Sequence, residues 1–256
     1  MGIGGNKMAI SDFAKEYHEK MFPNFESNLA KTDADLVEIF NNFAFDEVIN
    51  QTKLDDQTRM MAILASLIGC HAIDEFKIML LAALNLGVTP EVVKEIVYQA
   101  VPYVGMGRVY PFLHATNEIF ELSNISLPLA SAKTTTPKTR LEKGIEAQVE
   151  IFGNHMSEFY KSGPAETKHI NYWLATNCFG DYYTRRVLDL KQREMLTFCF
   201  LAALGGCEPQ LTSHAVANMR IGNDKLFLID IVSVCLPFIG YPRSLNAIRC
   251  IQQASK

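Results

Sequence analysis

Hydrophobic residues recur every three or four positions over most of the chain, which is the period of an α-helix with one apolar face. A clear stretch of this kind contains Met60, Met61, Ile63, Leu64, Leu67 and Ile68. No useful length alternates apolar and polar residues, as a half-buried strand would. The pattern therefore predicts an all-α protein.

Residues with specific roles at helix ends punctuate this pattern. Gly87 and Gly222 stand where the end of a helix favours a left-handed backbone. After Gly87, Thr89-Pro90-Glu91 has the order of an N-cap, a first-turn proline and an acidic first-turn residue. Asn223-Asp224 can cap the equivalent helix later in the chain. We also expect helices near residues 12–21, 35–43 and 137–153.

One pattern occurs twice in the chain. The segment 101–108 reappears 135 residues later as 236–243, with Gly105 matching Gly240 and Arg108 matching Arg243. Upstream, Arg59 matches Arg193 at a spacing of 134, which predicts one insertion near residues 205–206. We infer a first repeat over residues 1–130, a polar linker over 131–139, and a second repeat over 140–256.

Each repeat has too few helices to bury its own apolar face. Stacked units bury such faces against each other. The sequence therefore predicts two helical repeats that pack as a pseudo-symmetric fused dimer.

Composition narrows the function classes. The 256 residues carry a net charge of −4 without a basic patch, so nucleic acid is not an expected partner. No stretch approaches the ~20 apolar residues of a membrane helix. The six cysteines include no Cys-x-x-Cys pair. We interpret them as mainly buried thiols of a cytoplasmic protein.

Reactive side chains concentrate in residues 206–214. Seven positions separate Cys207 from His214, which is about 20° short of two helical turns, so one helix would place both on one face with Gln210 between them. Glu194 stands near the start of an apolar helix upstream and could pack beside that face. No second ligand stands three or four residues from His214, so we expect no metal site.

These residues resemble the carboxymuconolactone decarboxylase and alkylhydroperoxidase D family. The resemblance rests on a Glu at a helix start, an Ala/Leu run, Gly-Cys-Glu, a His seven after the Cys and a Gly eight after the His. It covers roughly 140–250 in the second repeat and, with weaker motif chemistry, 37–115 in the first. It implies Cys207, His214 and Glu194 as catalytic residues, with Gln210, Cys70, Glu75 and Arg193 as possible contributors.

The chain departs from the family pattern in both repeats. Peroxidase members carry Cys-x-x-Cys, but Gln210 stands at the second thiol position. In the first repeat, Met79 stands in place of His214 and Glu75 in place of Gln210. Cys70 lies two places before Ala72, the position that aligns with Cys207. The first site is thus predicted to be degenerate, and whether it lends Cys70 or Glu75 to a shared cleft stays open.

Three functions follow as hypotheses. The first is a cofactor-free decarboxylase-like enzyme that performs acid–base chemistry on a lactone or keto-acid-like small molecule, with His214 as acid and base. The second is a thiol peroxidase in which His214 activates Cys207. The third is a non-catalytic ligand-binding relative, in which Cys207 and His214 are core residues. The missing second thiol ranks the first ahead of the second.

The resemblance also implies an assembly. Relatives form rings of such units, so we expect a homo-oligomer, with a trimer of two-repeat chains favoured. For Arg193, at a helix start, the open alternatives are an ion pair and an anion-binding role.

Overall fold

The computed structural model describes residues 9–25 and 27–256, and these contain helices and no strand. The all-α prediction is thus confirmed. The elements are α1 (Asp12–Met21), α2 (Leu29–Thr32), α3 (Ala34–Asn42), η1 (Phe43–Glu47), α4 (Val48–Gln51), α5 (Asp56–Gly69), α6 (Ile73–Asn85), α7 (Pro90–Val104), α8 (Met106–Leu122), α9 (Arg140–Phe152), η2 (Asn154–Met156), η3 (Phe159–Lys161), α10 (Lys168–Trp173), η4 (Leu174–Tyr183), α11 (Leu190–Leu204), α12 (Glu208–Arg220), α13 (Lys225–Ile239) and α14 (Tyr241–Ala254).

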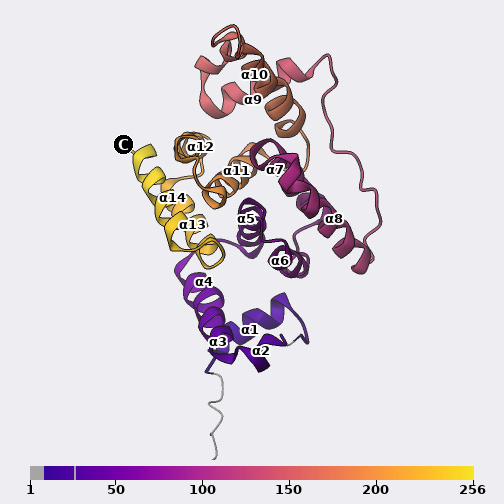
Figure 1. Ribbon diagram of the computed structural model, residues 1–256, viewed down its shortest axis with the longest axis vertical. Coiled ribbons are helices and arrows are strands. Elements are labelled where there is room, and N and C mark those ends of the chain that lie inside the picture. The colour runs from indigo at the N-terminus through magenta and orange to yellow at the C-terminus, as the bar shows by residue number, and fades with distance from the viewer. Residues whose placement is uncertain (1–8, 26) are drawn as a thin grey trace, which may run out of the picture.

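The two repeats appear as two matching sets of four helices. Helices α5 to α8 correspond in order to α11 to α14 (Figure 1). The spacing between equivalent residues changes from 134 to 135 because α11 has 15 residues and its counterpart α5 has 14. The helix starts predicted from the sequence are also present: Thr89 caps α7 through the backbone N–H of Val92, and Asp224 caps α13 through that of Phe227.

Helices α5 and α11 pack against each other at the centre of the molecule. Every residue of 59–69 and 193–203 is buried. A Cβ atom at Gly69 would lie 2.7 Å from the carbonyl oxygen of Phe200 and 2.8 Å from Cβ of Ala203. Gly69 therefore lets the two helices approach closely. The two repeats consequently share the main apolar core, and a smaller apolar cluster lies in the second repeat.

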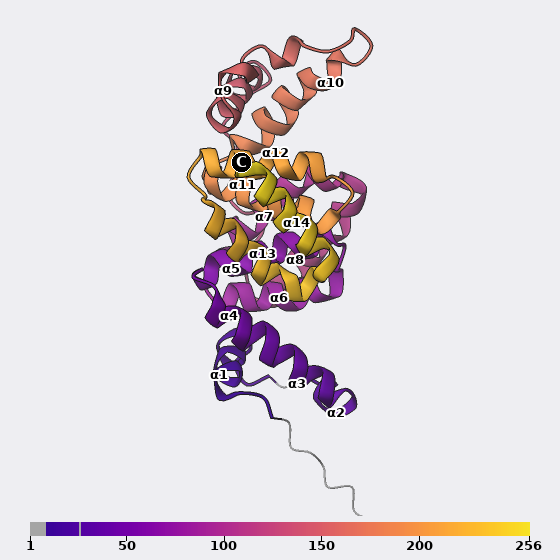
Figure 2. The ribbon, with the colours of Figure 1, turned by 90° about the vertical axis from the view of Figure 1, so that its left-hand side faces the viewer.

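The N-terminal segments of the repeats lie at opposite ends of the molecule. Figures 1 and 2 both show α1 to α3 at one end and α9 and α10 at the other. Each segment contains a π-helix, η1 or η4, a conformation that often occurs at functional sites. Helix α9 packs closely on η4, since Cβ atoms at Gly144 and Gly180 would overlap backbone oxygens. Tyr183, the last residue of η4, donates a hydrogen bond to Glu194 of α11, so η4 lies beside the first turns of α11.

The segment between the repeats is extended and bonded to the second repeat. Ala132 O accepts from the backbone N–H of Arg186, and the hydroxyl of Thr135 donates to Gly180 O at 2.9 Å. The boundaries at 130 and 140 stay predictions. Among the described residues, no helix is long and apolar enough to cross a membrane.

Candidate active site

The candidate site is built around a contact between His214 of α12 and Glu194 of α11. Nδ1 of His214 lies 2.7 Å from Oε2 of Glu194. The carboxylate is fully buried and the imidazole is one-tenth exposed. The sequence predicted that Glu194 could pack beside the face that carries His214. The structure brings the two side chains into hydrogen-bonding contact.

An asparagine fastens the two helices beside this pair. Asn218 lies one turn after His214, and its amide nitrogen donates to the backbone carbonyls of Glu194, at 3.0 Å, and His214, at 2.8 Å. Asn223 in turn donates to the side-chain oxygen of Asn218. These buried bonds fix the relative position of α11 and α12, and thereby the geometry of the His214–Glu194 contact.

Two tyrosines continue the polar chain from Glu194. The hydroxyl of Tyr183 donates to Oε1 of Glu194 at 2.7 Å, and it lies 2.8 Å from both the Thr197 and the Tyr103 hydroxyl oxygens. Burial, reinforced by neighbouring acidic groups, raises the pKa of Tyr103 and Tyr183 well above 10. Both phenols therefore keep their protons at neutral pH and act as hydrogen-bond donors.

Aromatic rings enclose the imidazole of His214. The rings of Tyr103 and Phe152 meet it edge to face, at centroid distances of 5.5 and 5.4 Å. Phe152 also packs on Phe179, which belongs to a small apolar cluster with Ile151. Polar interactions are stronger in such a poorly hydrated site than in water.

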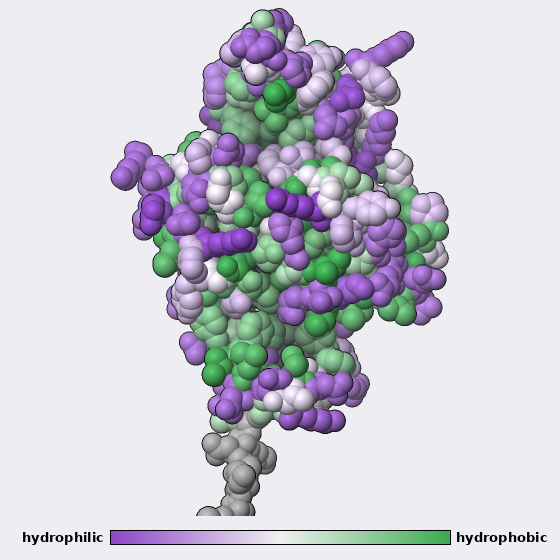
Figure 3. Space-filling model, viewed as in Figure 1, coloured by the Kyte–Doolittle hydropathy of each residue, from purple (hydrophilic) through white to green (hydrophobic). Residues whose placement is uncertain are grey.

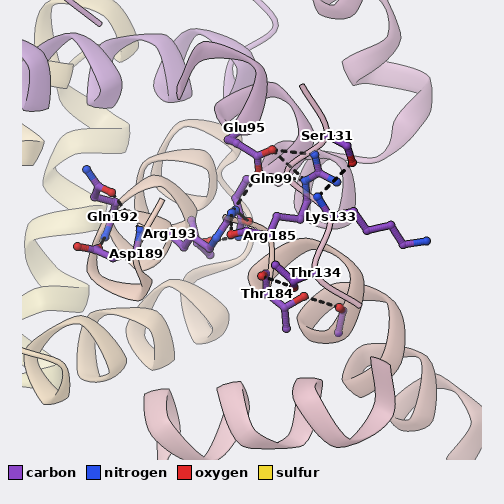
Figure 4. A network of polar contacts seen from close by, with 12 residues as sticks. Glu95, Gln99, Ser131, Lys133, Thr134, Thr184, Arg185, Asp189, Gln192 and Arg193 are labelled. Carbon is purple, nitrogen blue, oxygen red and sulfur yellow. Dashed lines mark hydrogen bonds and ion pairs between the residues drawn. The ribbon is translucent and has the colours of Figure 1, made fainter. Parts of the chain in front are cut away.

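One face of α7 from the first repeat supplies residues to this second-repeat site. Glu95, Gln99 and Tyr103 follow one another at intervals of four. Arg193 donates to Oε1 of Gln99 at 2.9 Å and to Oε2 of Glu95 at 3.1 Å. Gln99 donates in turn to the hydroxyl of Thr197. Figure 4 shows Glu95 and Gln99 facing Arg193 and Arg185.

Arg193 is committed to this internal network. Its side chain is fully buried, and its guanidinium also donates to Arg185 O at 2.6 Å. Arg185 makes a second ion pair with Glu95, at 2.8 Å. Burial lowers the pKa of Arg193, and the Glu95 carboxylate opposes that effect. Of the two roles considered for Arg193, the structure shows the ion pair, with Glu95.

The thiol of Cys207 occupies a different place from that predicted. Cys207 is the N-cap of α12, with φ −136° and ψ 37°, so it lies outside the helix. The prediction that a continuous helix carries Cys207 and His214 on one face is therefore wrong. The Sγ atom contacts Leu201 O at 3.4 Å, and among the described residues it makes no hydrogen bond to His214. Burial raises the pKa of Cys207, with Glu208 and Cys250 adding to the effect.

The other possible contributors lie apart from the His214–Glu194 pair. Gln210 is exposed on the first turn of α12. Cys70 ends α5, where its Sγ contacts Leu67 O at 3.7 Å and burial raises its pKa. Glu75 stands on the first turn of α6, makes no hydrogen bond to another described residue, and has its pKa raised by burial. None of the three makes a hydrogen bond to His214 or Glu194 in the described structure.

The equivalent place in the first repeat is apolar. At the spacings of the repeat, Met60 stands for Glu194, Met79 for His214, Val48 for Tyr183 and Phe238 for Tyr103. These four side chains line one small hollow of about 10 Å³, together with Tyr17 and Phe45. The space that holds the polar chain in the second repeat is thus lined mostly by apolar side chains in the first, with Arg59 and the Tyr17 hydroxyl as the polar groups of its wall.

In the described part of the chain, no group of three or more His, Cys, Asp or Glu side chains could hold a metal ion. The absence of a cofactor stays a prediction. Sequence reasoning missed Tyr103, Tyr183, Thr197 and Gln99. The available signal was the difference between repeats, because a polar residue stands at each of these positions and an apolar one at its counterpart.

The comparisons agree with this architecture. The model of the carboxymuconolactone decarboxylase family matches residues 34–118 and 170–253, which together are more than half of the chain. The protein belongs to the carboxymuconolactone decarboxylase family. It is similar to 4-carboxymuconolactone decarboxylase from Acinetobacter baylyi, with 29% identity over 94 residues that cover 37% of this chain and 70% of that protein.

A solved structure shares the fold. It belongs to a protein of Burkholderia xenovorans LB400 that is provisionally assigned as a gamma-carboxymuconolactone decarboxylase subunit. The two align with a TM-score of 0.56 and 18% identity, over 95% of this chain and 97% of that one. At this identity the likeness supports the two-repeat fold alone.

Proposed function

We propose that the protein is a decarboxylase-like enzyme that uses His214 for acid–base chemistry on a lactone or keto-acid-like small molecule. The observation that carries this proposal is the 2.7 Å contact between Nδ1 of His214 and Glu194. A buried carboxylate that accepts from Nδ1–H orients the imidazole and stabilises the imidazolium. It also leaves Nε2 as the atom that exchanges a proton with the substrate.

The reaction follows from that arrangement. As the C–C bond to the carboxylate breaks, CO2 leaves and the electron pair moves into a conjugated carbonyl of the substrate, which gives an enolate. The protonated His214 then returns a proton to carbon through Nε2, and solvent restores the imidazolium. The role of Glu194 is to hold the imidazole through both steps, and Tyr183 holds Glu194.

The enclosure of the site supports the same chemistry. Phe152, Phe179 and Tyr103 keep the imidazole in apolar surroundings. A substrate carboxylate is less well solvated there than in water, which favours its loss as neutral CO2. Arg220 lies beside Gly153, the residue after Phe152, since its Cζ would be 3.5 Å from a Cβ at that glycine. Arg193 is already bound to Glu95 and Gln99. We therefore propose Arg220 as the cation that receives a second substrate carboxylate.

The thiol peroxidase alternative has less support. Its nucleophile would be Cys207, but burial raises the pKa of that thiol and no hydrogen bond joins it to His214 in the described residues. A peroxidatic thiol needs a lowered pKa and a basic partner. Oligomerisation as a trimer remains a prediction from the resemblance, and a cytoplasmic location remains a prediction from the cysteines.

The test is release of CO2 from 4-carboxymuconolactone at saturating concentration, measured beside the consumption of an alkyl hydroperoxide. We expect CO2 release and no sustained peroxide turnover. Failure to release CO2 contradicts this version of the proposal. If the chain instead consumes peroxide and Cys207→Ser abolishes that activity, the thiol alternative is correct.

A further inference from the structure

The first repeat contains a large apolar hollow that the proposed chemistry does not use. It has a volume of about 720 Å³ and lies between α1 to α3, the first half of α6 and the end of α13. Small-molecule sites commonly have volumes of about 300 to 1,000 Å³ and mainly hydrophobic walls. The hollow is therefore of a size to bind a small molecule.

The walls of this hollow are rich in aromatic and aliphatic side chains. Five phenylalanines contribute, and so do large apolar residues that are more than two-fifths exposed: Phe25 at 58%, Leu29 at 53%, Leu36 at 59% and Ile78 at 46%. In Figure 3 apolar surface lies between the charged side chains at this end of the molecule and its central body. Exposure of this much apolar surface to water is unfavourable, so an apolar ligand that buries it would bind with a gain in free energy.

The hollow adjoins the first-repeat counterpart of the candidate active site. Met79 and Phe238, which correspond to His214 and Tyr103, belong to its wall. Glu75, which corresponds to Gln210, belongs to it as well. The first repeat thus has an opening beside the counterpart of the candidate active site, and Met79 and Phe238 stand there in place of His214 and Tyr103.

The charged groups of the wall select the ligand. Lys15, 56% exposed, is paired with Asp12 at 3.0 Å, and a carboxylate oxygen of Glu19 accepts from the backbone N–H of Asn24. His18 also belongs to the wall, and burial lowers its pKa, which favours the neutral imidazole. Glu75 makes no ion pair or hydrogen bond with another described residue. A ligand hydroxyl or amine would satisfy Glu75, whereas an anionic ligand would meet two carboxylates, Glu19 and Glu75.

We propose that this hollow is a second binding site, which takes a neutral or cationic aromatic molecule that carries one hydroxyl or amine donor for Glu75. The site lies in the first repeat and does not depend on the function proposed for the second. The first repeat is then a binding unit rather than only a scaffold.

Two fluorescent probes that share one aromatic ring system test this proposal on the full chain. N-phenyl-1-naphthylamine is neutral and has one N–H donor, and 1-anilinonaphthalene-8-sulfonate adds a negative charge. Fluorescence titration should show one N-phenyl-1-naphthylamine per chain. The sulfonate should bind at least tenfold more weakly, and Glu75→Gln should narrow that difference. Equal binding of the two probes by the unmodified protein would overturn the ligand class.

Blocking variants locate the site. Ile78→Trp on α6 and Leu36→Trp on α3 change lining residues at exposed positions, so the fold should tolerate both, as thermal unfolding would show. Leu81→Trp is the matched control, since Leu81 is 39% exposed on the same helix but does not line the hollow. The blocking variants should weaken N-phenyl-1-naphthylamine binding at least tenfold, and the control should bind normally.

Two results would refute the site. One is unchanged probe binding in both blocking variants. The other is that a second copy of the chain covers this face: sedimentation would then show that Ile78→Trp disrupts an oligomer, and probe binding would fall as protein concentration rises.

Discussion

The two repeats fold alike, but they place opposite chemistry at equivalent positions. In the second repeat, Glu194 and His214 form a buried polar contact that continues through Tyr183 to Tyr103. In the first repeat, Met60, Met79, Val48 and Phe238 fill the same place. The helices that carry these residues are matched nearly one for one. The fold therefore does not require the polar chain, which is what we expect of residues kept for chemistry rather than for packing.

The comparison also shows that the second-repeat site is not made by the second repeat alone. Glu95, Gln99 and Tyr103 reach it from α7 of the first repeat. The equivalent helix of the second repeat, α13, contributes Val234 and Phe238 to the matching place in the first repeat. Fusion of two repeats in one chain allows each to change separately, so one can supply supporting groups to the other's site.

The largest expected effect tests the buried arginines. Arg193→Met leaves Glu95 paired with Arg185, but it deprives the buried acceptors Gln99 Oε1 and Arg185 O of their donor, so the free energy of unfolding should fall by about 3 kcal/mol. Arg59→Met, the matched change, frees a carboxylate of Asp56 that is already 39% exposed, and should cost about 1 to 2 kcal/mol. Urea unfolding measures both. Equal losses of stability would mean that Arg193 and Arg59 contribute equally to the folding of their repeats.

The next effect concerns the carboxylate that holds His214. Glu194→Gln keeps the shape of the side chain but removes the charge that stabilises an imidazolium. The rate of CO2 release should fall by about 10² to 10⁴. Glu75→Gln changes a carboxyl group in the other repeat and should leave the rate within twofold. A Glu194→Gln enzyme with normal kcat would remove Glu194 from the mechanism.

A smaller effect is expected where the repeats meet. Tyr103→Phe keeps the ring against His214 but deletes the hydroxyl that lies 2.8 Å from that of Tyr183. Loss of this buried bond should lower kcat about tenfold and stability by about 1 kcal/mol. The reciprocal change, Phe238→Tyr, should not alter kcat. If Tyr103→Phe is fully active, α7 supports the fold but does not position the site.

The smallest effect is expected at the thiol. Because burial raises the pKa of Cys207, little thiolate exists at neutral pH, and the thiolate is the reactive form. Alkylation of Cys207 by iodoacetamide, followed by mass spectrometry, should accelerate as pH rises from 6 to beyond ~8.5, the pKa of an ordinary thiol. A rate that levels off below pH 7 would show a lowered pKa and would favour the peroxidase alternative.

Much of the fold could be predicted from the sequence because the signals are local and occur twice. Gly87, Thr89 and Asp224 mark helix ends, and the repeated segments at 101 and 236 establish two copies. The helical turns of residues 154–183 and the π-helix η4 were not predicted, because a π-helix depends on packing such as the contact of Gly180 with α9. The domain boundaries are still untested.

The site could be predicted only in part. His214 followed from its spacing to Cys207, Glu194 from its place near the start of the apolar helix upstream, and both from the resemblance. Gln99 lies 94 residues from Arg193 in sequence and Tyr103 lies 80 residues from Tyr183, and only folding brings them together. The helix-face argument failed for Cys207 because periodicity holds only within a helix, and α12 begins one residue later.

The central claim is that an imidazole, and not a thiol, performs the chemistry of the second repeat. The most direct test compares CO2 release from 4-carboxymuconolactone by His214→Asn and by Cys207→Ser under identical conditions. We predict that His214→Asn loses at least 100-fold in kcat while Cys207→Ser stays within twofold of the unmodified protein. Loss of activity in Cys207→Ser together with retention in His214→Asn would contradict the claim.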